Sequence, residues 1–329
     1  MKLIYIAHNL SDRIGGAEIS SINLIDKLRS LDIQVDCIDY KNIDEFNTKI
    51  QIMGPEKALK DYDLVLTQLA WAGDAESIAR AAGKRLLYFF HSWEHICKVG
   101  HTGIIPSICN KICKHCYYKN SDFKPDYAIA NSIYTQKMLK EHFSIDSSVM
   151  YPMLDYDNVM AEEKDPKYIT MSRYHYMKGT DRFVKIAEAM PEAMFRIVGY
   201  GREHWEDELP SNIVCSGHMN PKDYYKDTSI WMSPSRFDSF GMTIIEAQLN
   251  NIPVLATNIC AVKEDQTVML GSTISNGDDT DEWVKKIYFW LNKNKNGASL
   301  KVANEKINKF LNSDGTLEVI RMAEKANEK

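Results

Sequence analysis

The stretch Ser235-Arg-Phe-Asp-Ser-Phe-Gly-Met-Thr-Ile-Ile-Glu246 decides how the fold of this chain is interpreted. The apolar run before it, Ser229 to Met232, is expected to be a strand, and Thr243 to Asn250 has the spacing of a helix. Gly241 stands between them, and the helix is expected to begin near Met242. A strand, a loop and a helix in this order are the building block of an α/β domain with a parallel sheet.

Short apolar runs and helical stretches alternate on both sides of this segment, which predicts two Rossmann-like α/β domains. The runs expected in the first domain are Leu3 to Ala7, Ala17 to Ser30, Gln34 to Ile38, Asp63 to Thr67, Asp74 to Ala82, Arg85 to Phe90, Asp126 to Ala130 and Ser132 to His142. Those expected in the second are Tyr168 to Met171, Asp181 to Ala189, Phe195 to Val198, Ile213 to Cys215, Ser229 to Met232, Thr243 to Asn250 and Val254 to Ala256. Ser132 is the expected N-cap of its helix.

The chain length and one connector set the expected domain boundary. A chain of 329 residues exceeds the size that a single hydrophobic core usually serves. The segment from Pro152 to Pro166 has little apolar periodicity, so we place the boundary there. The predicted domains are residues 1–153 and 154–312, facing an interdomain cleft. A helix at about residues 313–329 is expected to pack back on the first domain.

The composition disfavours several functional classes. The 40 basic and 45 acidic residues give a net charge of −5, so no nucleic-acid partner is expected. The run Leu3 to Ala7 is too short for a signal peptide and no 18-residue apolar stretch follows, so a cytoplasmic protein is expected. The odd number of cysteines, 7, indicates reduced thiols. Cys37, Cys215 and Cys260 lie in strand-like runs and are expected in the core.

The segment Pro234 to Glu246, with Asn251-Ile-Pro-Val-Leu-Ala256 after it, resembles the donor-site signature of family 4 glycosyltransferases (GT4), which have the GT-B fold. The usual signature has two glutamates eight positions apart around Phe-Gly. Here Asp238 takes the first place and Glu246 the second, so the spacing holds but the first side chain is one methylene shorter. The resemblance extends over nearly the whole chain.

The resemblance and the chemistry of the segment assign roles to its residues. Free backbone N–H groups at the start of the helix can receive a diphosphate, and Gly241 allows close approach. The resemblance implies that Glu246 binds the ribose and that Asp238 binds hydroxyls of the donor sugar. The alternative is that neither residue binds a ligand: Asp238 would be a solvated acid in a loop, and Glu246 an acid near a helix N-terminus, where the helix macrodipole favours it. The donor-binding residues expected in and near this segment are Gly217, His218, Asp238, Ser239, Phe240, Gly241, Met242, Thr243 and Glu246.

A basic pair, Arg173 and Lys178, stands in Met171-Ser-Arg-Tyr-His-Tyr-Met-Lys-Gly179 and resembles the pair that holds the donor diphosphate in this family. Negative charge develops on the leaving oxygens, and fixed cations aimed at them lower the barrier. They can therefore act where other enzymes use a divalent metal, and no metal is expected. The alternative is a surface pair, but both residues follow an expected strand at its ligand-facing end.

Two further features belong to the first domain. Gly15 and Gly16 follow the opening strand and resemble the glycine-rich loop that reaches the donor phosphates, although a mere turn is the alternative. Their context is not G-x-G-x-x-G, which disfavours a dinucleotide-binding dehydrogenase.

His91 ends an apolar strand, and the resemblance implies a role near the donor sugar or the acceptor. The alternative is a histidine satisfied at a strand end. Asp61-Tyr-Asp63 precedes its strand and is interpreted as structural.

The segment Cys97 to Lys124 leaves two hypotheses open. Its Cys109, Cys113 and Cys116 have spacings compatible with zinc, although reduced thiols are favoured. Lysines alternate with isoleucines and tyrosines there, which would suit an interface with a lipid-linked acceptor, although an ordinary amphipathic helix is narrowly preferred. A peripheral contact at the cytoplasmic face of a membrane is therefore one alternative for the first domain.

The predicted function is a retaining, hexosyltransferase-type glycosyltransferase of polysaccharide biosynthesis. It would move a sugar from a nucleotide sugar, with a UDP-sugar favoured over a GDP-sugar, to a glycan or lipid-linked glycan. The resemblance supplies the retention of configuration. The catalytic candidates are His91, Arg173, Lys178 and Asp238. Two alternatives stand beside this prediction: a GT-B nucleotide-sugar-binding partner subunit with weak or no activity, and a nucleotide-sugar epimerase.

Overall fold

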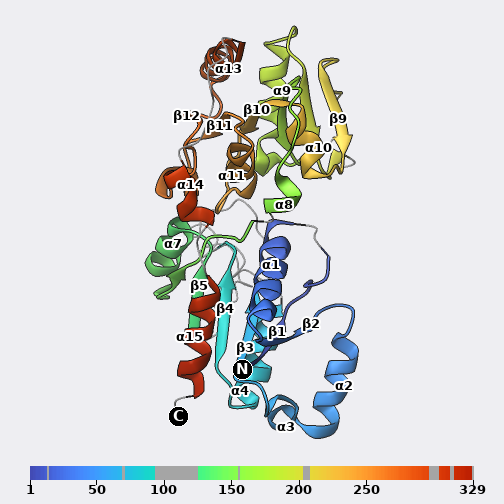
Figure 1. Cartoon of the computed structure of the whole chain (residues 1–329), viewed down its shortest axis with the longest axis vertical. Coiled ribbons are helices and arrows are strands. Elements are labelled where there is room, and N and C mark those ends of the chain that lie inside the picture. Colours follow the sequence, from blue (N-terminus) through green and yellow to red (C-terminus); the bar gives the residue numbers. More distant parts are fainter. Residues whose placement is uncertain are drawn as a thin grey trace. The chain divides into compact units, whose positions relative to one another are not determined.

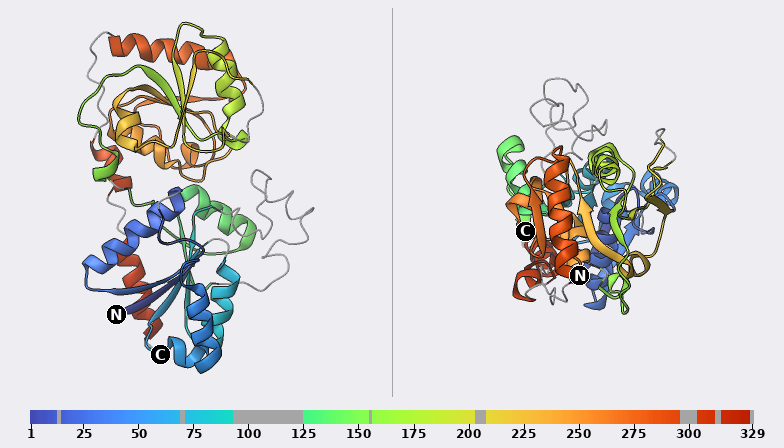
Figure 2. Two further views of the ribbon diagram at one scale, coloured as in Figure 1. Left: turned by 90° about the vertical axis from the view of Figure 1, so that its right-hand side faces the viewer. Right: turned by 90° about the horizontal axis from the view of Figure 1, so that it is seen from above.

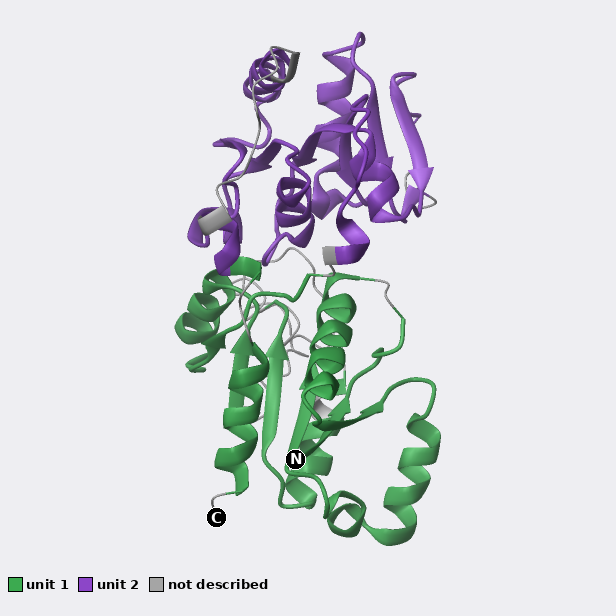
Figure 3. Cartoon of the chain, viewed as in Figure 1, with its two compact units in different colours: residues 1–154, 310–329 green, residues 155–309 purple. Residues whose placement is uncertain are grey.

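The computed structural model describes residues 1–12, 15–68, 71–92, 125–154, 156–202, 208–295, 304–311 and 315–327. The chain divides into two compact units, and Figure 3 shows the division. Unit 1 comprises Met1–Leu154 and Phe310–Lys329, and unit 2 comprises Asp155–Lys309. Each unit holds a parallel sheet with helices on its faces (Figure 1), so the predicted α/β class with two Rossmann-like units is confirmed.

The sheet of unit 1 has six parallel strands in the order β2-β1-β3-β4-β5-β6. The strands are β1 (Lys2–Ile6), β2 (Gln34–Ile38), β3 (Leu64–Gln68), β4 (Leu86–Phe90), β5 (Tyr127–Ala130) and β6 (Ser148–Val149). Leu3 of β1 pairs with Val35 on one side and with Leu64 on the other. The central strands are buried throughout because helices cover both faces of the sheet.

Helices at both ends of the chain cover one face of the unit 1 sheet. The helices of this unit are α1 (Gly16–Ser30), α2 (Ile43–Met53), α3 (Pro55–Leu59), α4 (Ala72–Ala81), α7 (Ile133–Phe143) and α15 (Gly315–Asn327). Leu24 of α1 and Val319 of α15 belong to one buried cluster with Leu3 and Leu66 of the sheet. The left view in Figure 2 shows α1 and α15 on the same side of this sheet. The last helix is therefore part of the core of unit 1.

The sheet of unit 2 also has six parallel strands, in the order β12-β11-β10-β7-β8-β9. The strands are β7 (Tyr168–Ser172), β8 (Phe195–Val198), β9 (Ile213–Gly217), β10 (Thr228–Ser233), β11 (Val254–Thr257) and β12 (Gly271–Ile274). This is the doubly wound order of dinucleotide-binding folds, in which the direction of winding reverses between the first strand and the fourth. In unit 2 that reversal lies between β7 and β10.

Alternating side chains of the unit 2 strands enter two separate cores. Ile230 packs with Phe183 of α9 and Trp283 of α13, whereas the neighbouring Trp231 packs with Tyr225 of α10 on the opposite face. This alternation follows from the period of two in a strand and fixes the register of the sheet. The helices are α8 (Tyr156–Val159), α9 (Thr180–Glu188), α10 (Pro221–Lys226), α11 (Met242–Leu249), α12 (Cys260–Glu264), α13 (Thr280–Lys295) and α14 (Asn304–Leu311), with a 3-10 turn, η3 (Tyr176–Lys178).

Some local predictions are confirmed and others are wrong. The Ser132 hydroxyl accepts a hydrogen bond from the Thr135 N–H at 3.0 Å, so the predicted N-cap is present. The Asp63 carboxylate accepts from the Lys2 N–H at 2.7 Å, which fits its structural interpretation. The cysteine prediction is confirmed only in part: Cys37 packs against the core of unit 1, whereas Cys215 is exposed on the edge strand β9 and Cys260 opens the helix α12, half-buried. Within the described part of the chain, no helix is long and apolar enough to span a bilayer.

Candidate functional site

The site of unit 2 lies at the carboxyl ends of β7 and β10, where the sheet reverses its direction of winding. Arg173 follows β7 directly, and the segment Ser235 to Gly241 runs from the end of β10 to the start of α11. Open α/β sheets bind ligands outside the carboxyl ends of their strands at this reversal point. The two motifs singled out in the sequence therefore meet on adjacent strands, since β10 pairs with β7.

The loops after β7 and β10 are in direct contact. Gly179 has φ +79°, and a Cβ added there would lie 2.1 Å from the carbonyl oxygen of Pro234. The Arg236 N–H donates to the Met177 carbonyl at 2.8 Å. Glycine is therefore required at 179 for two reasons, the left-handed backbone and the close approach of the neighbouring loop.

The Arg236 side chain ties these loops to helix α9. Its guanidinium donates to both oxygens of Asp181, at 2.6 and 2.8 Å, and lies 3.9 Å from the ring centre of Tyr176. Burial opposes ionisation of Asp181, but the hydrogen bonds and charge of Arg236 hold its pKa below the usual value. A two-point bond to a carboxylate fixes orientation as well as distance. Arg236 thus holds the loop after β10 in place.

Two of the predicted side chains form an ion pair in this site. The Lys178 ammonium lies 2.7 Å from Asp238 Oδ2, with 34% and 15% of the two side chains exposed. The other carboxylate oxygen, Oδ1, lies 3.4 Å from the Phe240 N–H. The ammonium is therefore held at the loop before α11 and keeps exposed surface for a ligand.

Arg173 has an unusual backbone conformation. Its φ is +68°, in the left-handed region that residues with a Cβ rarely adopt. The Arg173 N–H donates to the Val198 carbonyl at 2.7 Å, which fixes this turn at the end of β7. Such conformations cost about 1–3 kcal/mol and cluster at binding sites. The turn leaves the Arg173 side chain exposed at the carboxyl edge of the sheet.

His175 lies between the two cations and caps the turn η3. Its Nδ1 accepts a hydrogen bond from the Met177 N–H at 3.1 Å. Partial burial, followed by the charges of Arg173 and Lys178, lowers the pKa of His175 below its ordinary value of 6.5. The imidazole ring therefore stays neutral and its Nδ1 can accept the hydrogen bond from Met177. The positive charges of Arg173 and Lys178 disfavour protonation of this ring.

The helix α11 begins where the sequence predicts, at Met242. Its N-cap, Gly241, has φ +80° and ψ +61°, and no side chain caps the helix. Phe240 is buried beneath this turn, while Ser239, Met242 and Thr243 are partly exposed. A helix start without a side-chain cap leaves N–H groups for an anionic group.

Glu246 is 8% exposed and is held from within the unit. The Tyr225 hydroxyl donates to Glu246 Oε2 at 2.8 Å. Burial, and then the Glu246 charge, raise the pKa of Tyr225 well above its usual value, so the phenol remains protonated and donates. Tyr225 fixes the orientation of this carboxylate one turn into α11.

The ends of β8 and β9 carry the remaining residues predicted in unit 2. Gly217 ends β9 with φ +62°, and His218 follows it. The His218 ring stacks on Tyr200, with ring centres 5.1 Å apart and planes 17° apart. Both side chains are exposed, so a flat aromatic surface lies at this edge of the sheet.

In unit 1, His91 follows β4 and belongs to a buried polar network. Its Nε2 lies 2.6 Å from Gln68 Oε1, which also accepts from the Tyr5 hydroxyl at 2.7 Å. Ser21 Oγ lies 3.4 Å from the same ring nitrogen. Because an amide oxygen only accepts, Nε2 carries the proton in this arrangement. Side chains of unit 1 therefore orient the His91 imidazole. A role of His91 in binding a ligand stays a prediction.

The glycine pair of unit 1 opens helix α1. Gly15 is the N-cap with φ −131° and ψ 170°, an extended conformation that any residue can adopt. A Cβ added at Gly15 would lie 2.6 Å from Glu18 Oε2 of the first turn. The backbone angle therefore does not require glycine at 15, and contact of Gly15 and Gly16 with donor phosphates stays a prediction.

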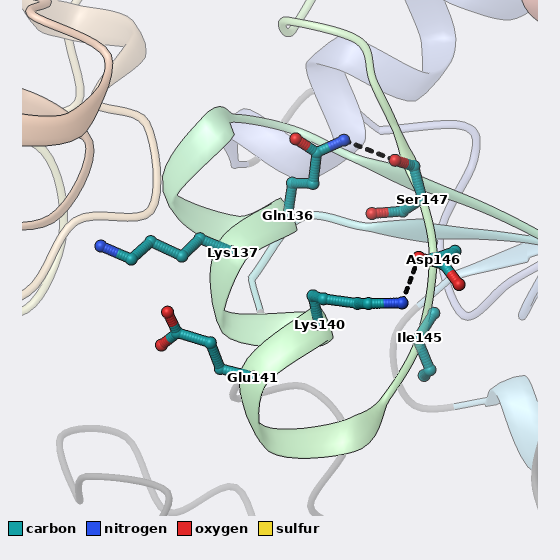
Figure 4. Close-up of a pocket in the computed structure, with 7 residues that line it drawn as sticks. All are labelled: Gln136, Lys137, Lys140, Glu141, Ile145, Asp146 and Ser147. Atoms are coloured by element: carbon teal, nitrogen blue, oxygen red, sulfur yellow. Dashed lines mark hydrogen bonds and ion pairs between the residues drawn. The ribbon is translucent and has the colours of Figure 1, made fainter.

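A pocket of about 320 Å³ lies elsewhere in unit 1, on helix α7 (Figure 4). Its lining residues are Gln136, Lys137, Lys140, Glu141, Ile145, Asp146 and Ser147. Lys140 and Asp146 close one side with an ion pair of 2.6 Å, and both side chains are more than half exposed. None of the site residues predicted from the sequence lines this pocket.

The segment Cys97 to Lys124 lies outside the described residues, so the choices between zinc and reduced thiols, and between a lipid interface and an ordinary amphipathic helix, stay predictions. Among the residues that the structure describes, no group of three His, Cys, Asp or Glu side chains is arranged to hold a metal ion.

The residues that orient the predicted site residues through hydrogen bonds were not predicted from the sequence. Arg236 stands within the quoted segment, but its partner Asp181 is 55 positions away, so the bond depends on strand pairing. Tyr225 lies in the aromatic pair Tyr224-Tyr225, which looks like core in a sequence. Gln68 is the last residue of β3. Its position at the carboxyl end of a strand could have identified it as a candidate site residue.

Residues 165–293 match the family model described as glycosyl transferases group 1. The chain is 28% identical over 170 residues to an uncharacterized 41.2 kDa protein of the cps region of Klebsiella pneumoniae, covering 48% of this chain and 46% of that relative. It is 29% identical over 109 residues to the lipopolysaccharide core biosynthesis mannosyltransferase LpsB of Rhizobium meliloti, covering 28% of this chain and 31% of LpsB. The chain therefore matches less than half the length of either relative.

Solved structures are similar over the whole chain. Sucrose-phosphate synthase from Thermosynechococcus elongatus has a TM-score of 0.74 at 13% identity, covering 99% of both chains. HepE of Anabaena, in complex with UDP-glucose, has a TM-score of 0.67 at 16% identity, covering 100% of this chain and 98% of HepE. These likenesses confirm the GT-B fold. The match to the family model covers residues 165–293, less than half of the chain.

Proposed function

We propose that this protein is a retaining glycosyltransferase of family 4 that transfers a hexose from a nucleotide sugar to a glycan or lipid-linked glycan. The observation that carries the proposal is the meeting of Arg173, Lys178 and the open start of α11 at the reversal point of the unit 2 sheet. Cations and free N–H groups at one place are suited to a diphosphate. The match of residues 165–293 to a glycosyltransferase model supports the same assignment.

In the proposed reaction, unit 2 holds the donor. Arg173 and Lys178 bind the diphosphate, Glu246 accepts hydrogen bonds from the ribose, and Asp238 binds a hydroxyl of the sugar. The acceptor hydroxyl attacks the anomeric carbon from the face that the diphosphate leaves. The bond from that carbon to the phosphate oxygen breaks, and the hydroxyl proton passes to the departing oxygen. The two cations stabilise the charge that develops there.

A UDP-sugar is the proposed donor. HepE, which shares the fold, forms a complex with UDP-glucose. The carboxylate of Glu246 would bind the ribose and not the base, so a GDP-sugar is the second donor to test. LpsB, which is 29% identical to this chain over 109 residues, is a mannosyltransferase of lipopolysaccharide core biosynthesis. A glycan acceptor in polysaccharide biosynthesis is proposed on that likeness.

One observation favours a second candidate, a nucleotide-sugar-binding partner subunit. Asp238 replaces the glutamate of the family signature and forms an ion pair with Lys178. A carboxylate engaged in this way, one methylene short, would bind the donor sugar less well. Under this alternative, unit 2 binds the nucleotide but the chain does not turn it over.

The test begins with thermal shifts in UDP, GDP, ADP and dTDP, followed by hydrolysis of UDP-glucose and of GDP-mannose. We expect UDP to stabilise the protein and a UDP-sugar to be turned over. Arg173→Ala should lower that turnover at least about tenfold, roughly 1.4 kcal/mol of barrier. The matched control is Lys285→Ala, which removes an exposed cation on α13. Binding without turnover would favour the partner subunit, and no stabilisation by any nucleotide would reject both candidates.

A further inference from the structure

Three aromatic side chains form a row at the carboxyl edge of the unit 1 sheet. His8 follows β1, Tyr40 follows β2 and Trp71 follows β3. The His8 ring lies 6.1 Å from the Tyr40 ring, nearly parallel to it, and 5.5 Å from the Trp71 ring, edge to face. His8 is exposed, Tyr40 is 47% exposed and Trp71 is partly exposed. The three rings therefore contact one another and also keep surface that is exposed to solvent.

The row occupies the position in this sheet where ligands bind in related topologies. With the order β2-β1-β3-β4, the winding of unit 1 reverses between β1 and β3. His8 and Trp71 stand on the two sides of that reversal. His91, the catalytic candidate that lies in unit 1, follows β4, the next strand along the same edge. A ligand lying on the row would therefore extend towards His91 within the same unit.

The backbone that carries His8 and Tyr40 is held by Asp39, which is 2% exposed. The Asp39 carboxylate accepts from the N–H groups of Leu10 at 3.3 Å and Lys41 at 2.9 Å, and also from the Ser11 hydroxyl. The Tyr40 N–H donates to the His8 carbonyl at 3.1 Å. The loops after β1 and β2 are thus bonded to each other. A surface held in this way loses little conformational entropy when a ligand binds.

A polar pair borders the aromatic row. The Tyr40 hydroxyl donates to Asp12 Oδ2 at 2.5 Å, and the Lys41 ammonium lies 3.0 Å from Asp12 Oδ1. The Lys41 and Asp12 side chains are 48% and 38% exposed. A carboxylate that accepts and an ammonium that donates, side by side, match the hydroxyls of a sugar, each of which both donates and accepts.

We propose that His8, Tyr40 and Trp71 form a stacking surface for a pyranose ring of a glycan, with Asp12 and Lys41 binding its hydroxyls. One face of a pyranose carries C–H groups that pack on an aromatic ring, while hydroxyls project from its rim. A hydrocarbon chain would leave the ion pair of Asp12 and Lys41 desolvated without new partners. The inference rests on the proposed function, in which this surface binds the acceptor glycan.

The experiment is saturation-transfer NMR on the full chain with methyl pyranosides of glucose, galactose, mannose and N-acetylglucosamine as probes. We expect saturation of the ring protons of at least one pyranoside. Trp71→Ala and Tyr40→Ala should each weaken it by at least about fivefold, because each removes an aromatic face. Asp12→Asn should weaken it as well. Phe289→Ala, which removes an exposed ring on α13 of unit 2, is the matched control and should leave it unchanged.

The outcomes separate this inference from the proposed function. Each variant is also tested for its melting temperature and for stabilisation by UDP, which the cations of unit 2 are proposed to bind. Saturation that is absent for every pyranoside, or that persists in Trp71→Ala and Tyr40→Ala with both variants folded, overturns the sugar surface even where UDP still binds. Saturation that depends on the row while UDP fails to bind supports the surface and counts against the proposed donor site.

Discussion

The Lys178 ammonium and the Asp238 carboxylate lie 2.7 Å apart although 60 positions separate them in the sequence. The loop after β7 supplies one and the loop after β10 the other. The carboxylate is 15% exposed, so water screens the pair less than it screens an exposed surface pair. Asp238 therefore fixes the position of the Lys178 ammonium through this ion pair, whether or not Asp238 also binds the donor sugar.

The first prediction concerns this pair. We expect Lys178→Ala and Asp238→Asn each to lower turnover of a UDP-sugar by about tenfold or more. Because each side chain orients the other, the double variant should lose less than the sum, with a coupling of roughly 0.5–3 kcal/mol. Steady-state kinetics of the four proteins measure this coupling. Fully additive losses would mean that the two residues act separately on the donor.

The second prediction compares two glycines with the same backbone angle. Gly179 and Gly54 both have φ +79°, but a Cβ at 54 meets nothing within 4 Å, whereas one at 179 meets the Pro234 carbonyl oxygen at 2.1 Å. Gly54→Ala should cost only the left-handed strain, about 1–2 kcal/mol. Gly179→Ala should cost roughly 1–3 kcal/mol more through overpacking.

Melting temperatures of the two variants measure the difference. Gly179→Ala should also weaken UDP binding, since it separates the two loops of the donor site, while Gly54→Ala should leave UDP binding unchanged. Equal losses of stability in both variants would show that the loops after β7 and β10 move apart freely.

The fold could be predicted from the sequence because the information was local. Alternating apolar runs and a period of two or 3.6 identify strands and helices one at a time. The helix α2, in which only Phe46 is buried, and the short elements α3 and β12 gave no such signal and were missed. Cys215 is exposed although Ile213, two positions before it on the same face of the strand, is buried; β9 is an edge strand, and sequence periodicity does not show which strand lies at the edge.

The third prediction concerns Glu246. Glu246→Ala should weaken UDP binding, because the proposed ribose ligand is lost. It should also lower the free energy of unfolding by about 1–3 kcal/mol, since the buried Tyr225 hydroxyl is left without this acceptor. Isothermal titration with UDP, well below the melting temperature, separates the two effects.

Tyr225→Phe is the matched control for Glu246→Ala. It removes the internal hydrogen bond and keeps the carboxylate, so it should reduce stability by about 1 kcal/mol and UDP affinity by less than Glu246→Ala does. UDP affinity that stays intact in Glu246→Ala would remove the ribose role.

The fourth prediction concerns pH and His175. Partial burial, then Arg173 and Lys178, lower the pKa of His175 in the folded protein below 6.5. The unfolded chain therefore binds more protons in acid. This contribution to stability is complete above the unfolded value of about 6.5 and is lost as the pH falls through the lower folded pKa.

His175→Asn tests this dependence, because asparagine can cap the turn η3 without titrating. Between about pH 7.5 and pH 5.5, the melting temperature of the variant should fall less than that of the parent chain. An identical fall in both proteins would assign the acid sensitivity to other groups.

The candidate site was only partly predictable, because its contacts join distant segments. The spacing of Asp238 and Glu246 is visible in the sequence, since both lie around one helix start. The partners that orient them, Lys178 and Tyr225, depend on which strands become neighbours and on which face a helix is buried. Sequence periodicity gives neither piece of information.

The packing of α15 in unit 1 has a consequence for synthesis on the ribosome. Val319, Met322 and Ala323 of α15 complete a core whose remaining buried side chains come from the first 154 residues, yet all of unit 2 is translated between them. Unit 2 can therefore fold while the face of unit 1 that α15 covers is still open. A nascent chain stalled before α15 would expose Leu3 and Leu66 to solvent or to chaperones. Loss of α15 alone would therefore damage unit 1, although most of that unit is synthesised before unit 2.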